Sequence, residues 1–425
     1  MKTAKYPKKE ALTELLTRPV IDQEDLSTVV NDVLQKVKHG GDELVRALTE
    51  KFDQVRLDDF LVTEKEKATA RELVSKELKD AIRAAALNIE RFHSAQREDF
   101  TPVETMPGVR CWRKSVPIEK VGLYIPGGTA PLFSTVLMLA IPARLAGCQE
   151  VVLCTPPGKD GLVNPAILVA AEVAGVAKIF KVGGSQAIAA LAYGTESIPK
   201  VDKIFGPGNR YVTAAKMLVQ RDGVAIDMPA GPSEVLVFAD QSAVPAFVAS
   251  DLLSQAEHDV DSQVVLLTTN EKMLDEVKNA VEQQVANLPR QKMLQAALSH
   301  SVAILLEDEQ EAIDAINEYA PEHLILACEN AGRVASQVIN AGSVFLGNFT
   351  PESAGDYASG TNHTLPTSGF ARSYSGVSLD SFLKKITFQQ ITKAGLQTLG
   401  PIIMTMAEAE QLPAHAKAVE LRLKY

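Results

Sequence analysis

The residues best suited to chemistry form one short polar run, Ser254-Gln255-Ala256-Glu257-His258. Positions three residues apart share one face of a helix, so the Gln255 amide and the His258 imidazole could hold one ion between them. Residues 244–256 keep a helical spacing of apolar side chains, and Pro245 suits the first turn of such a helix. A strand-like run follows, so we expect the pair at a helix-to-strand corner, where ligand sites gather. Without further partners, a glutamine and a histidine at the end of a surface helix are usually only solvated.

Two further segments carry groups that exchange protons or bind metals. Glu322 and His323 place a carboxylate beside an imidazole at the start of a predicted strand, and both can act as acid or base. The alternative is that Glu322 only caps a helix and orients its neighbour. Residues 352–366 predict a glycine-rich polar loop, in which Asp356 supplies an anionic oxygen and His363 a donor or acceptor. Such loops usually touch ligands, and a plain surface loop is the alternative.

These segments together predict an incomplete metal site. Gln255, His258 and Asp356 offer nitrogen and oxygen ligands suited to zinc, although glutamine is an uncommon ligand. Manganese or cobalt would accept the same ligands. A fourth ligand must come from elsewhere in the chain.

Two series of short β-rich runs, each run followed by a helical segment, must position these residues. The first series comprises residues 121–125, 151–154, 178–182 and 203–205, and the second comprises 234–238, 263–267, 302–306, 323–326 and 343–346. Strands that alternate with helices at this spacing predict parallel sheets with helices on their faces. Two series predict two related α/β domains with a ligand cleft between them. Residues 26–100 have a charged helical pattern, and the sequence after Phe382 returns to helical, amphipathic character.

Composition narrows the class of protein. The chain has 425 residues, 46% of them hydrophobic and 23% charged, which predicts a globular protein with more than one core. A net charge of −10 argues against nucleic-acid binding. The most apolar segment, residues 136–143, is too short to cross a bilayer, and the N-terminus leads into no apolar stretch, so we expect a cytoplasmic protein without membrane contact. The four cysteines have no CxxC spacing, so neither a disulfide framework nor a thiolate zinc cluster is expected.

Dinucleotide binding has only a weak local signal. No G-x-G-x-x-G follows any predicted strand. The turn Gly127-Gly128-Thr129-Ala130-Pro131 could present backbone N–H groups to a phosphate, with Pro131 near a helix start. Glycine-rich turns more often simply close strands.

Taken together, these motifs closely resemble those of the histidinol dehydrogenases over nearly the whole chain. The matching strings, in the family's order, are residues 121–131, 183–191, 205–209, 227–234, 254–258, 321–323 and 355–363. The resemblance implies oxidation of L-histidinol through L-histidinaldehyde to L-histidine, the last step of histidine biosynthesis, with two NAD⁺ and one water. It also implies an α/β fold of two related, incomplete Rossmann-like parallel-sheet domains with small helical extensions. The expected division is an N-terminal helical arm (1–21), a first domain with the metal and catalytic residues (22–108 and 235–380), a second, NAD-binding domain (109–234), and a C-terminal helical arm (381–425).

The resemblance also implies roles for single residues. One zinc ion per subunit would be held by Gln255, His258, Asp356 and His415, the last from the neighbouring subunit of a homodimer with intertwined C-terminal arms. His323 would be the base for both hydride transfers, and Glu322 would activate the water that hydrates the aldehyde. Substrate contacts would come from the four metal ligands and from Ser233, His323, His363 and Glu410, and NAD contacts from Tyr124, Gln186 and Asn209. We expect weak NAD binding, because few backbone amides would reach the pyrophosphate.

Other functions and mechanisms stay open from the residues alone. A zinc-dependent hydrolase could use Glu322 to activate water, but the sequence lacks H-E-x-x-H and that function leaves the glycine-ended strands unexplained. A dehydrogenase of a related amino alcohol, or a binding protein with a closed structural zinc site, would share the same ligands. In a rival mechanism Cys111 or Cys148 would trap the aldehyde as a thiohemiacetal, although buried structural cysteine is the commoner role.

Overall fold

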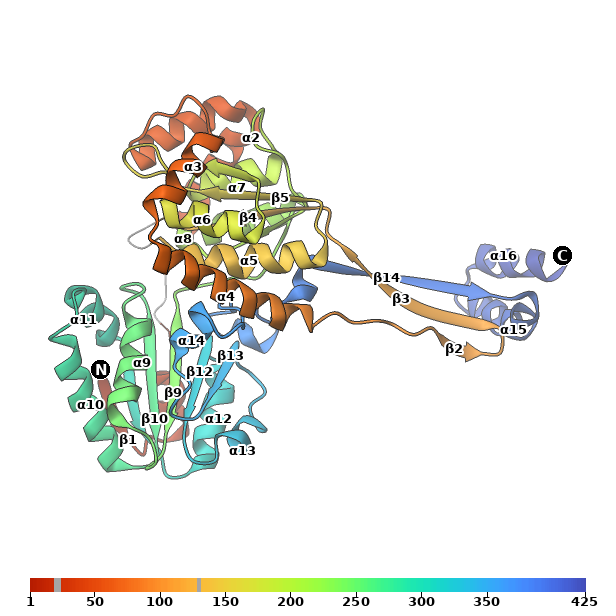
Figure 1. Ribbon diagram of the computed structural model, residues 1–425. Coiled ribbons are helices and arrows are strands. Elements are labelled where there is room, and N and C mark those ends of the chain that lie inside the picture. Colours follow the sequence, from red (N-terminus) through yellow and green to blue (C-terminus); the bar gives the residue numbers. More distant parts are fainter. Residues whose placement is uncertain (19–23, 128–130) are drawn as a thin grey trace.

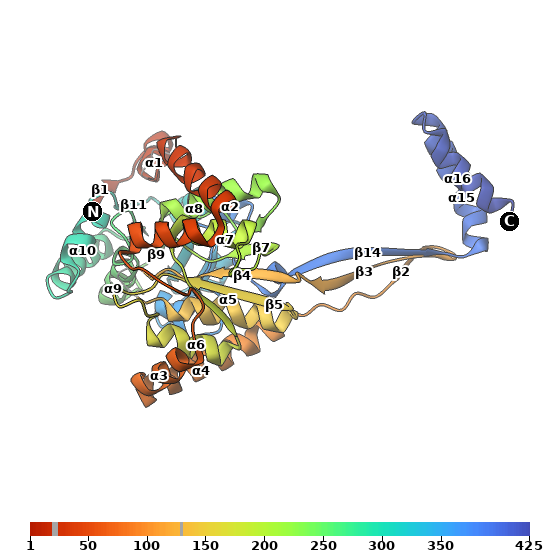
Figure 2. The same cartoon turned by 90° about the horizontal axis from the view of Figure 1, so that it is seen from above.

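Two α/β lobes and a long, narrow arm make up the computed structural model, which describes residues 1–18, 24–127 and 131–425 (Figure 1). Each lobe contains one parallel sheet, as the alternation of strands and helices predicts. The arm projects from the lobes and carries the C-terminus at its far end (Figure 2). Among the described residues, no helix is both long and apolar enough to cross a membrane.

The first lobe is built on a six-stranded sheet in the order β1-β11-β10-β9-β12-β13. Its strands are β1 (Lys2–Lys5), β9 (Glu234–Ala239), β10 (Gln263–Thr268), β11 (Val302–Leu305), β12 (His323–Ala327) and β13 (Ser343–Leu346). One face is covered by α9 (Pro245–Ala256), α10 (Glu271–Val285) and α11 (Gln291–Ser299), and the other by α1 (Lys9–Leu15), α12 (Glu309–Tyr319) and α13 (Ala331–Ala335). Alternate strand residues enter the two cores, so Val235 and Val237 lie in one and Leu236 and Phe238 in the other.

The second lobe is built on a five-stranded sheet in the order β6-β5-β4-β7-β8. Its strands are β4 (Lys120–Tyr124), β5 (Glu150–Thr155), β6 (Lys178–Lys181), β7 (Lys203–Phe205) and β8 (Ala225–Ile226). One face is covered by α3 (Glu64–Leu73), α4 (Lys76–Ser94), α5 (Phe133–Ala146) and α6 (Pro165–Ala174), and the other by α2 (Glu24–Asp53), α7 (Gly184–Tyr193) and α8 (Arg210–Val219). Both predicted series of parallel strands are therefore confirmed.

Helices α2, α3 and α4 lie within residues 22–108, which the sequence analysis groups with the first lobe, and they pack on the second lobe. Val33 and Val37 of α2 share a core with α7 and α8, and Ile82 and Ile89 of α4 share a core with α5. The apolar stripe of each amphipathic helix is thus covered by helices of the second lobe. The N-terminal residues also differ from a purely helical arm, because β1 pairs in parallel with β11 at the sheet edge. The domain boundaries themselves remain a prediction.

The arm corrects the helix predicted directly after Phe382. Residues 383–391 form β14 (Leu383–Ile391), which pairs antiparallel with β3 (Val109–Pro117), and β2 (Val103–Met106) completes a three-stranded sheet. Phe388 lies opposite Trp112 in the register, and the two rings stack with centroids 5.6 Å apart. This cross-strand contact explains why a local helical pattern yields to a strand. Helices α15 (Lys393–Ala409) and α16 (Pro413–Leu423) follow at the tip, where helices are predicted.

Candidate active site

The Gln255/His258 pair lies at the predicted helix-to-strand corner. Helix α9 ends at Ala256, and β10 begins at Gln263. Gln255, in the last turn, is only 1% exposed, whereas His258 lies just beyond the helix and is exposed. The two residues remain adjacent because the His258 N–H donates to the Gln255 carbonyl at 3.3 Å. The corner therefore presents an imidazole beside a buried amide.

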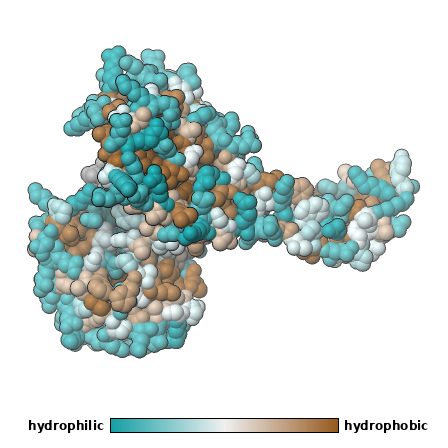
Figure 3. All heavy atoms as spheres, viewed as in Figure 1, coloured by the Kyte–Doolittle hydropathy of each residue, from teal (hydrophilic) through white to brown (hydrophobic). Residues whose placement is uncertain are grey.

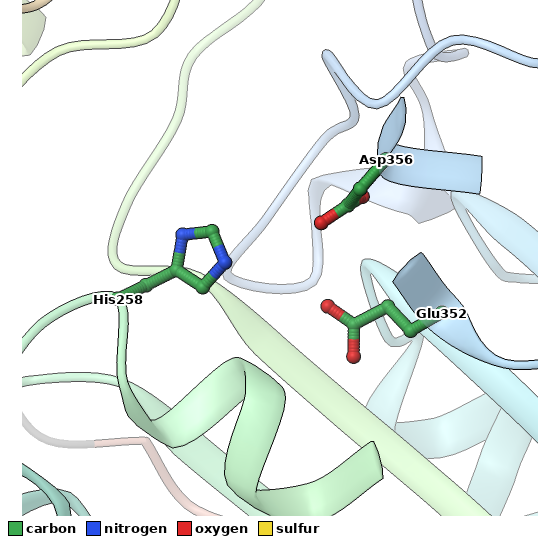
Figure 4. Close-up of side chains that lie close together, drawn as sticks. All are labelled: His258, Glu352 and Asp356. Atoms are coloured by element: carbon green, nitrogen blue, oxygen red, sulfur yellow. The ribbon is translucent and has the colours of Figure 1, made fainter. Parts of the chain in front are cut away.

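Two carboxylates meet His258 at this corner. Glu352 and Asp356 belong to the short helix α14 (Glu352–Tyr357), which replaces the first part of the predicted loop. Their spacing of four residues puts them on one helix face. One ligand atom from each of His258, Glu352 and Asp356 lies within 4.8 Å of the others, and the three side chains point toward one another (Figure 4). The structure thus brings Asp356 close to His258 and adds Glu352, which the sequence analysis missed.

Gln255 contacts the same carboxylate cluster. Its amide nitrogen donates to Glu352 when the amide is oriented to satisfy both of its ends, and its oxygen then accepts from the Glu234 N–H at 3.1 Å. Glu352 is itself 1% exposed and lies 3.5 Å from the Ser254 hydroxyl. Three of the four predicted metal ligands are therefore gathered around Glu352.

The fourth predicted ligand, His415, is not part of this cluster within one chain. It lies exposed in α16 at the tip of the arm, far from the lobes (Figure 1). Glu410, the predicted substrate contact between α15 and α16, is likewise exposed at that tip. The separation follows from the strand pair β3 and β14, which holds the two terminal helices away from the lobes.

The predicted acid–base pair is buried next to the cluster. Glu322 is 5% exposed and His323, the first residue of β12, is 3% exposed. The His323 ring lies between carboxylates: Nδ1 is 3.6 Å from Glu322 Oε2 and 4.0 Å from Glu352 Oε1, and Nε2 is 3.5 Å from Asp356 Oδ1. Nδ1 also lies 3.3 Å from the Glu234 carbonyl oxygen. The predicted base His323 therefore contacts both Glu352 and Asp356, two members of the donor cluster.

Three carboxylates surround His323, which can carry only one positive charge. Burial lowers the pKa of His323, but the neighbouring Glu322 and Glu352 carboxylates outweigh burial and raise that pKa well above its usual value. Burial raises the pKa of Glu352, and although burial also acts on Asp356, its contact with His323 lowers the pKa of Asp356 overall. His323 Nε2 and Asp356 Oδ1 are buried and have no hydrogen-bond partner among the described residues. Buried polar atoms without hydrogen-bond partners are expected where an ion, a water molecule or a ligand binds.

Glu234 supports the acid–base pair and was also missed from the sequence. Its backbone N–H donates to Glu322 Oε2 at 2.9 Å, and its carboxylate accepts from the Glu322 N–H at 3.3 Å. Arg18 binds that carboxylate from behind with two hydrogen bonds of 2.5 and 2.7 Å. The predicted substrate contact Ser233 directly precedes Glu234 at the start of β9. The signal in the sequence that could have identified Glu234 was a charged residue at the start of an otherwise apolar strand.

His363 joins the site to the second lobe. Its Nδ1 is 2.8 Å from the Asp356 carbonyl oxygen, so this nitrogen donates, and Nε2 lies 3.1 Å from the Thr135 hydroxyl of α5. Burial lowers the pKa of His363. The next residue back, Asn362, donates to the Met138 carbonyl at 2.6 Å. The structure therefore places His363 at the site, where its predicted contact with substrate remains a prediction.

The predicted cofactor residues follow strand ends in the second lobe. Tyr124 ends β4, and its hydroxyl accepts from the Gly184 N–H at 3.1 Å. Gln186, in the first turn of α7, is 1% exposed, and its Nε2 has no partner among the described residues. Asn209 follows β7 and caps α8 by accepting from Tyr211 N–H and Val212 N–H. Tyr124 and Gln186 are thus gathered around Gly184, while Asn209 has a capping role of its own.

The remaining sequence candidates lie outside these groups. The phosphate-binding turn proposed at 127–131 falls mostly on residues 128–130, which are outside the described residues. Cys111 lies within β3 of the arm, and Cys148 precedes the amino end of β5. Burial raises the pKa of Cys148 to about 11, which disfavours the thiolate that a thiohemiacetal mechanism requires.

The fold and the site define a two-lobed α/β enzyme whose acid–base pair adjoins a metal-type donor cluster. The sequence profile described as histidinol dehydrogenase matches residues 16–423. A histidinol dehydrogenase of Bacteroides thetaiotaomicron is 61% identical over 100% of this chain and 99% of its own, and one of Escherichia coli is 54% identical over 97% and 95%. The crystal structure of histidinol dehydrogenase from Elizabethkingia anophelis superposes with a TM-score of 0.98 at 57% identity, covering 100% of this chain and 98% of the other. The chain belongs to the histidinol dehydrogenase family and is an oxidoreductase of this type.

Proposed function

We propose that this enzyme oxidises L-histidinol through L-histidinaldehyde to L-histidine, the last step of histidine biosynthesis, with two NAD⁺ and one zinc ion per subunit. The observation that carries the proposal is the contact of the buried base His323 with Asp356, which also belongs to the His258 cluster. An alcohol must lose its proton as hydride leaves, so a base beside a substrate-holding ion suits this reaction. Family membership supports the choice of substrate.

The donor set supports zinc. Imidazole nitrogen and carboxylate oxygen bind zinc at about 2.0–2.2 Å, so ligand atoms within 4.8 Å of one another need only small movements to share one ion. Asp356 Oδ1 is a suitable ligand atom, because it is buried and has no hydrogen-bond partner among the described residues, although His323 Nε2 lies 3.5 Å away. His258, Asp356 and Gln255 would hold the ion, with His415 of a second copy, and Gln255 would then turn its amide oxygen toward the cluster. When bound, zinc would act as a Lewis acid that orients the amino alcohol, and NAD⁺ would accept the hydride.

The protein's own groups would move the protons. His323 Nδ1 lies near the Glu234 carbonyl, so the neutral ring would carry its proton there and present Nε2 as the base. Nε2 would take the hydroxyl proton of the alcohol in the first oxidation and that of the aldehyde hydrate in the second. Glu322 would take a proton from the water that adds to the aldehyde. A cation in the cluster would offset the carboxylates that raise the pKa of His323 and so bring the base toward neutral pH.

The second lobe supports NAD binding. Gln186 Nε2 is a buried donor without a hydrogen-bond partner among the described residues, and it lies at the amino end of α7, where the helix dipole favours an anionic group. Tyr124 closes the same corner through Gly184. A solved NAD-dependent aldehyde dehydrogenase from Sinorhizobium meliloti has a TM-score of 0.50 at 13% identity over 88% of each chain, which shows a related fold only. Tyr124, Gln186 and Asn209 remain the proposed contacts.

The arm supports a homodimer. Nine residues of paired strand span about 30 Å, so β3 and β14 hold α16 too far out to return His415 to its own lobes. The tip also exposes large apolar side chains, with Ile402 49% and Met406 60% exposed, and Figure 3 shows apolar patches along the arm. Such surfaces usually mark protein contacts. A second copy could cover the arm and receive His415 in its site.

Two measurements test the proposal. Purified enzyme supplied with histidinol and NAD⁺ should form two NADH per histidine; release of product without NADH would favour the zinc hydrolase instead, and faster turnover of another amino alcohol would change the substrate. Mixing a His258→Ala chain with a His415→Ala chain should restore activity, because one of the two sites in a mixed dimer is intact. No recovery in verified mixed dimers would contradict a shared site.

A further inference from the structure

One carboxylate oxygen of the second lobe, Asp53 Oδ2, is buried and has no hydrogen-bond partner among the described residues. Asp53 is the last residue of α2, and its Oδ2 accepts no hydrogen bond among the described residues. Burial raises the pKa of Asp53 to about 6. The eight residues outside the described ranges include no lysine, arginine or histidine. Asp53 Oδ2 therefore has no hydrogen-bond partner in the part of the chain that the structure describes.

The run of α2 along α7 brings Asp53 to the cofactor corner. Asp42 lies at the far end of α7, where its N–H donates to Glu196 at 2.7 Å and its carboxylate accepts from the Ser197 N–H at 3.3 Å. From this point α2 packs against α7 (Figure 2) and ends at Asp53. Because α7 begins at Gly184, the antiparallel run ends beside the Gly184 turn.

Two further contacts agree with this position. After α2 the chain runs beside the carboxyl end of β6, where the Val62 N–H donates to the Ile179 carbonyl and the Lys181 N–H to the Phe60 carbonyl. In addition, the charge of Asp53 helps to raise the pKa of Tyr124, after the larger effect of burial. These observations place the end of α2, and with it Asp53, near Tyr124.

We propose that Asp53 accepts hydrogen bonds from the adenosine ribose hydroxyls of the dinucleotide and makes the enzyme select NAD over NADP. This inference rests on the proposed NAD-dependent function. The buried Gln186 amide and the Asp53 carboxylate, both without partners, would be satisfied by one ligand that carries both acceptor and donor groups. A carboxylate accepts from a pair of ribose hydroxyls and repels a phosphate on the same ring, as acidic residues do in dinucleotide folds with a glycine fingerprint. Here the carboxylate would come from a helix end in place of that fingerprint.

The test is direct binding of NADH and NADPH, followed by nicotinamide fluorescence in the absence of histidinol. Asp53→Asn keeps the shape and removes the charge, and Glu50→Gln makes the same change at an exposed site one turn earlier in α2. Loss of charge-assisted hydrogen bonds should weaken NADH binding by about 10- to 100-fold, with no such loss for NADPH. Glu50→Gln should match the unsubstituted enzyme. An NADH/NADPH preference that changes less than about 3-fold in Asp53→Asn would overturn the inference.

Two further measurements separate the possible failures. Asp53→Asn should melt no lower than the unsubstituted protein, because it removes a partly buried charge that has no partner. Asp53→Ser, which is smaller and also uncharged, should show the same reduced preference for NADH over NADPH. A preference for NADH that is preserved in Asp53→Ser would count against the role of the charge. If the unsubstituted enzyme binds neither dinucleotide and forms no NADH with histidinol, the proposed function itself fails. If it turns over with NAD⁺ but Asp53→Asn binds both dinucleotides as before, only the present inference fails.

Discussion

Replacing Arg18 by methionine should destabilise the first lobe by about 3–5 kcal/mol, because it leaves the Glu234 carboxylate buried without a cation. Glu234 is 2% exposed, and Arg18 binds both of its oxygens, at 2.5 and 2.7 Å. Arg18 also donates to the Tyr319 carbonyl at 2.8 Å and lies 3.9 Å from the centre of the Tyr319 ring. An exposed ion pair contributes only about 0–1 kcal/mol to stability. The larger loss expected for Arg18→Met follows from the burial of Glu234.

The loss should depend on pH. Burial already raises the pKa of Glu234, and Arg18 opposes this rise, so removing Arg18 should raise the folded-state pKa further. A carboxyl whose pKa is raised on folding contributes stability that is present below its unfolded pKa, about 4.3, and is lost as the pH rises through the folded value. Arg18→Met should therefore cost less at pH 5.5 than at pH 8.5.

Urea unfolding at both pH values measures the effect. The control is Arg71→Met, which removes an ion pair to Glu172 whose two side chains are 47% and 46% exposed. The double variant Arg18→Met/Glu234→Gln should regain much of the lost stability, because it removes the unpaired charge. The reasoning is refuted if Arg18→Met at pH 8.5 costs no more than Arg71→Met, or if its cost does not increase with pH.

Three other outcomes are expected. Lys216→Met should destabilise the second lobe by about 3–5 kcal/mol in urea unfolding, because Lys216 is 2.5 Å from Asp227 and both side chains are at most 4% exposed; a loss below about 1 kcal/mol would contradict this. His258→Ala should lower the zinc content, measured by elemental analysis, to well below half of that in an exposed-site control, His39→Ala; equal contents would place the ion elsewhere. Glu322→Gln should slow NADH formation from histidinaldehyde by about 10²–10⁴-fold and leave the first oxidation less affected, which single-turnover assays distinguish; equal losses in both steps would reject its role with water.

Local patterns in the sequence predicted the parallel strands well and the edge strands poorly. The central run 323–326 appears as β12 because a short apolar run between turn residues is a strong signal for a buried strand. By contrast, β1 and β14 owe their extended form to pairing with β11 and β3. Those partners lie far away in the sequence, so periodicity could not reveal the pairing.

The sequence predicted which residues gather at the site better than it predicted the side chains and secondary structure around them. Gln255, His258 and Asp356 were expected to share one ion, and the structure brings them together around Glu352. Glu352 was missed because the segment was predicted as loop, which hides the four-residue spacing of an acidic helix face. The position of the site on the sheet is also unusual, because it lies at the amino ends of β9, β10 and β12 rather than at their carboxyl ends.

The pattern of buried charge supports binding of a cation at this site. Two other buried carboxylates have a cation from the chain itself, Arg18 at Glu234 and Lys216 at Asp227. Glu352 and Asp356 receive no lysine or arginine among the described residues, and the undescribed ones include none. Two nearby carboxylates are costly to bury unless a positive charge offsets them, and His323 supplies at most one. At Glu234 and Asp227 the fold meets this requirement with its own side chains, and its absence at Glu352 and Asp356 supports the proposal that a cation from solution binds there.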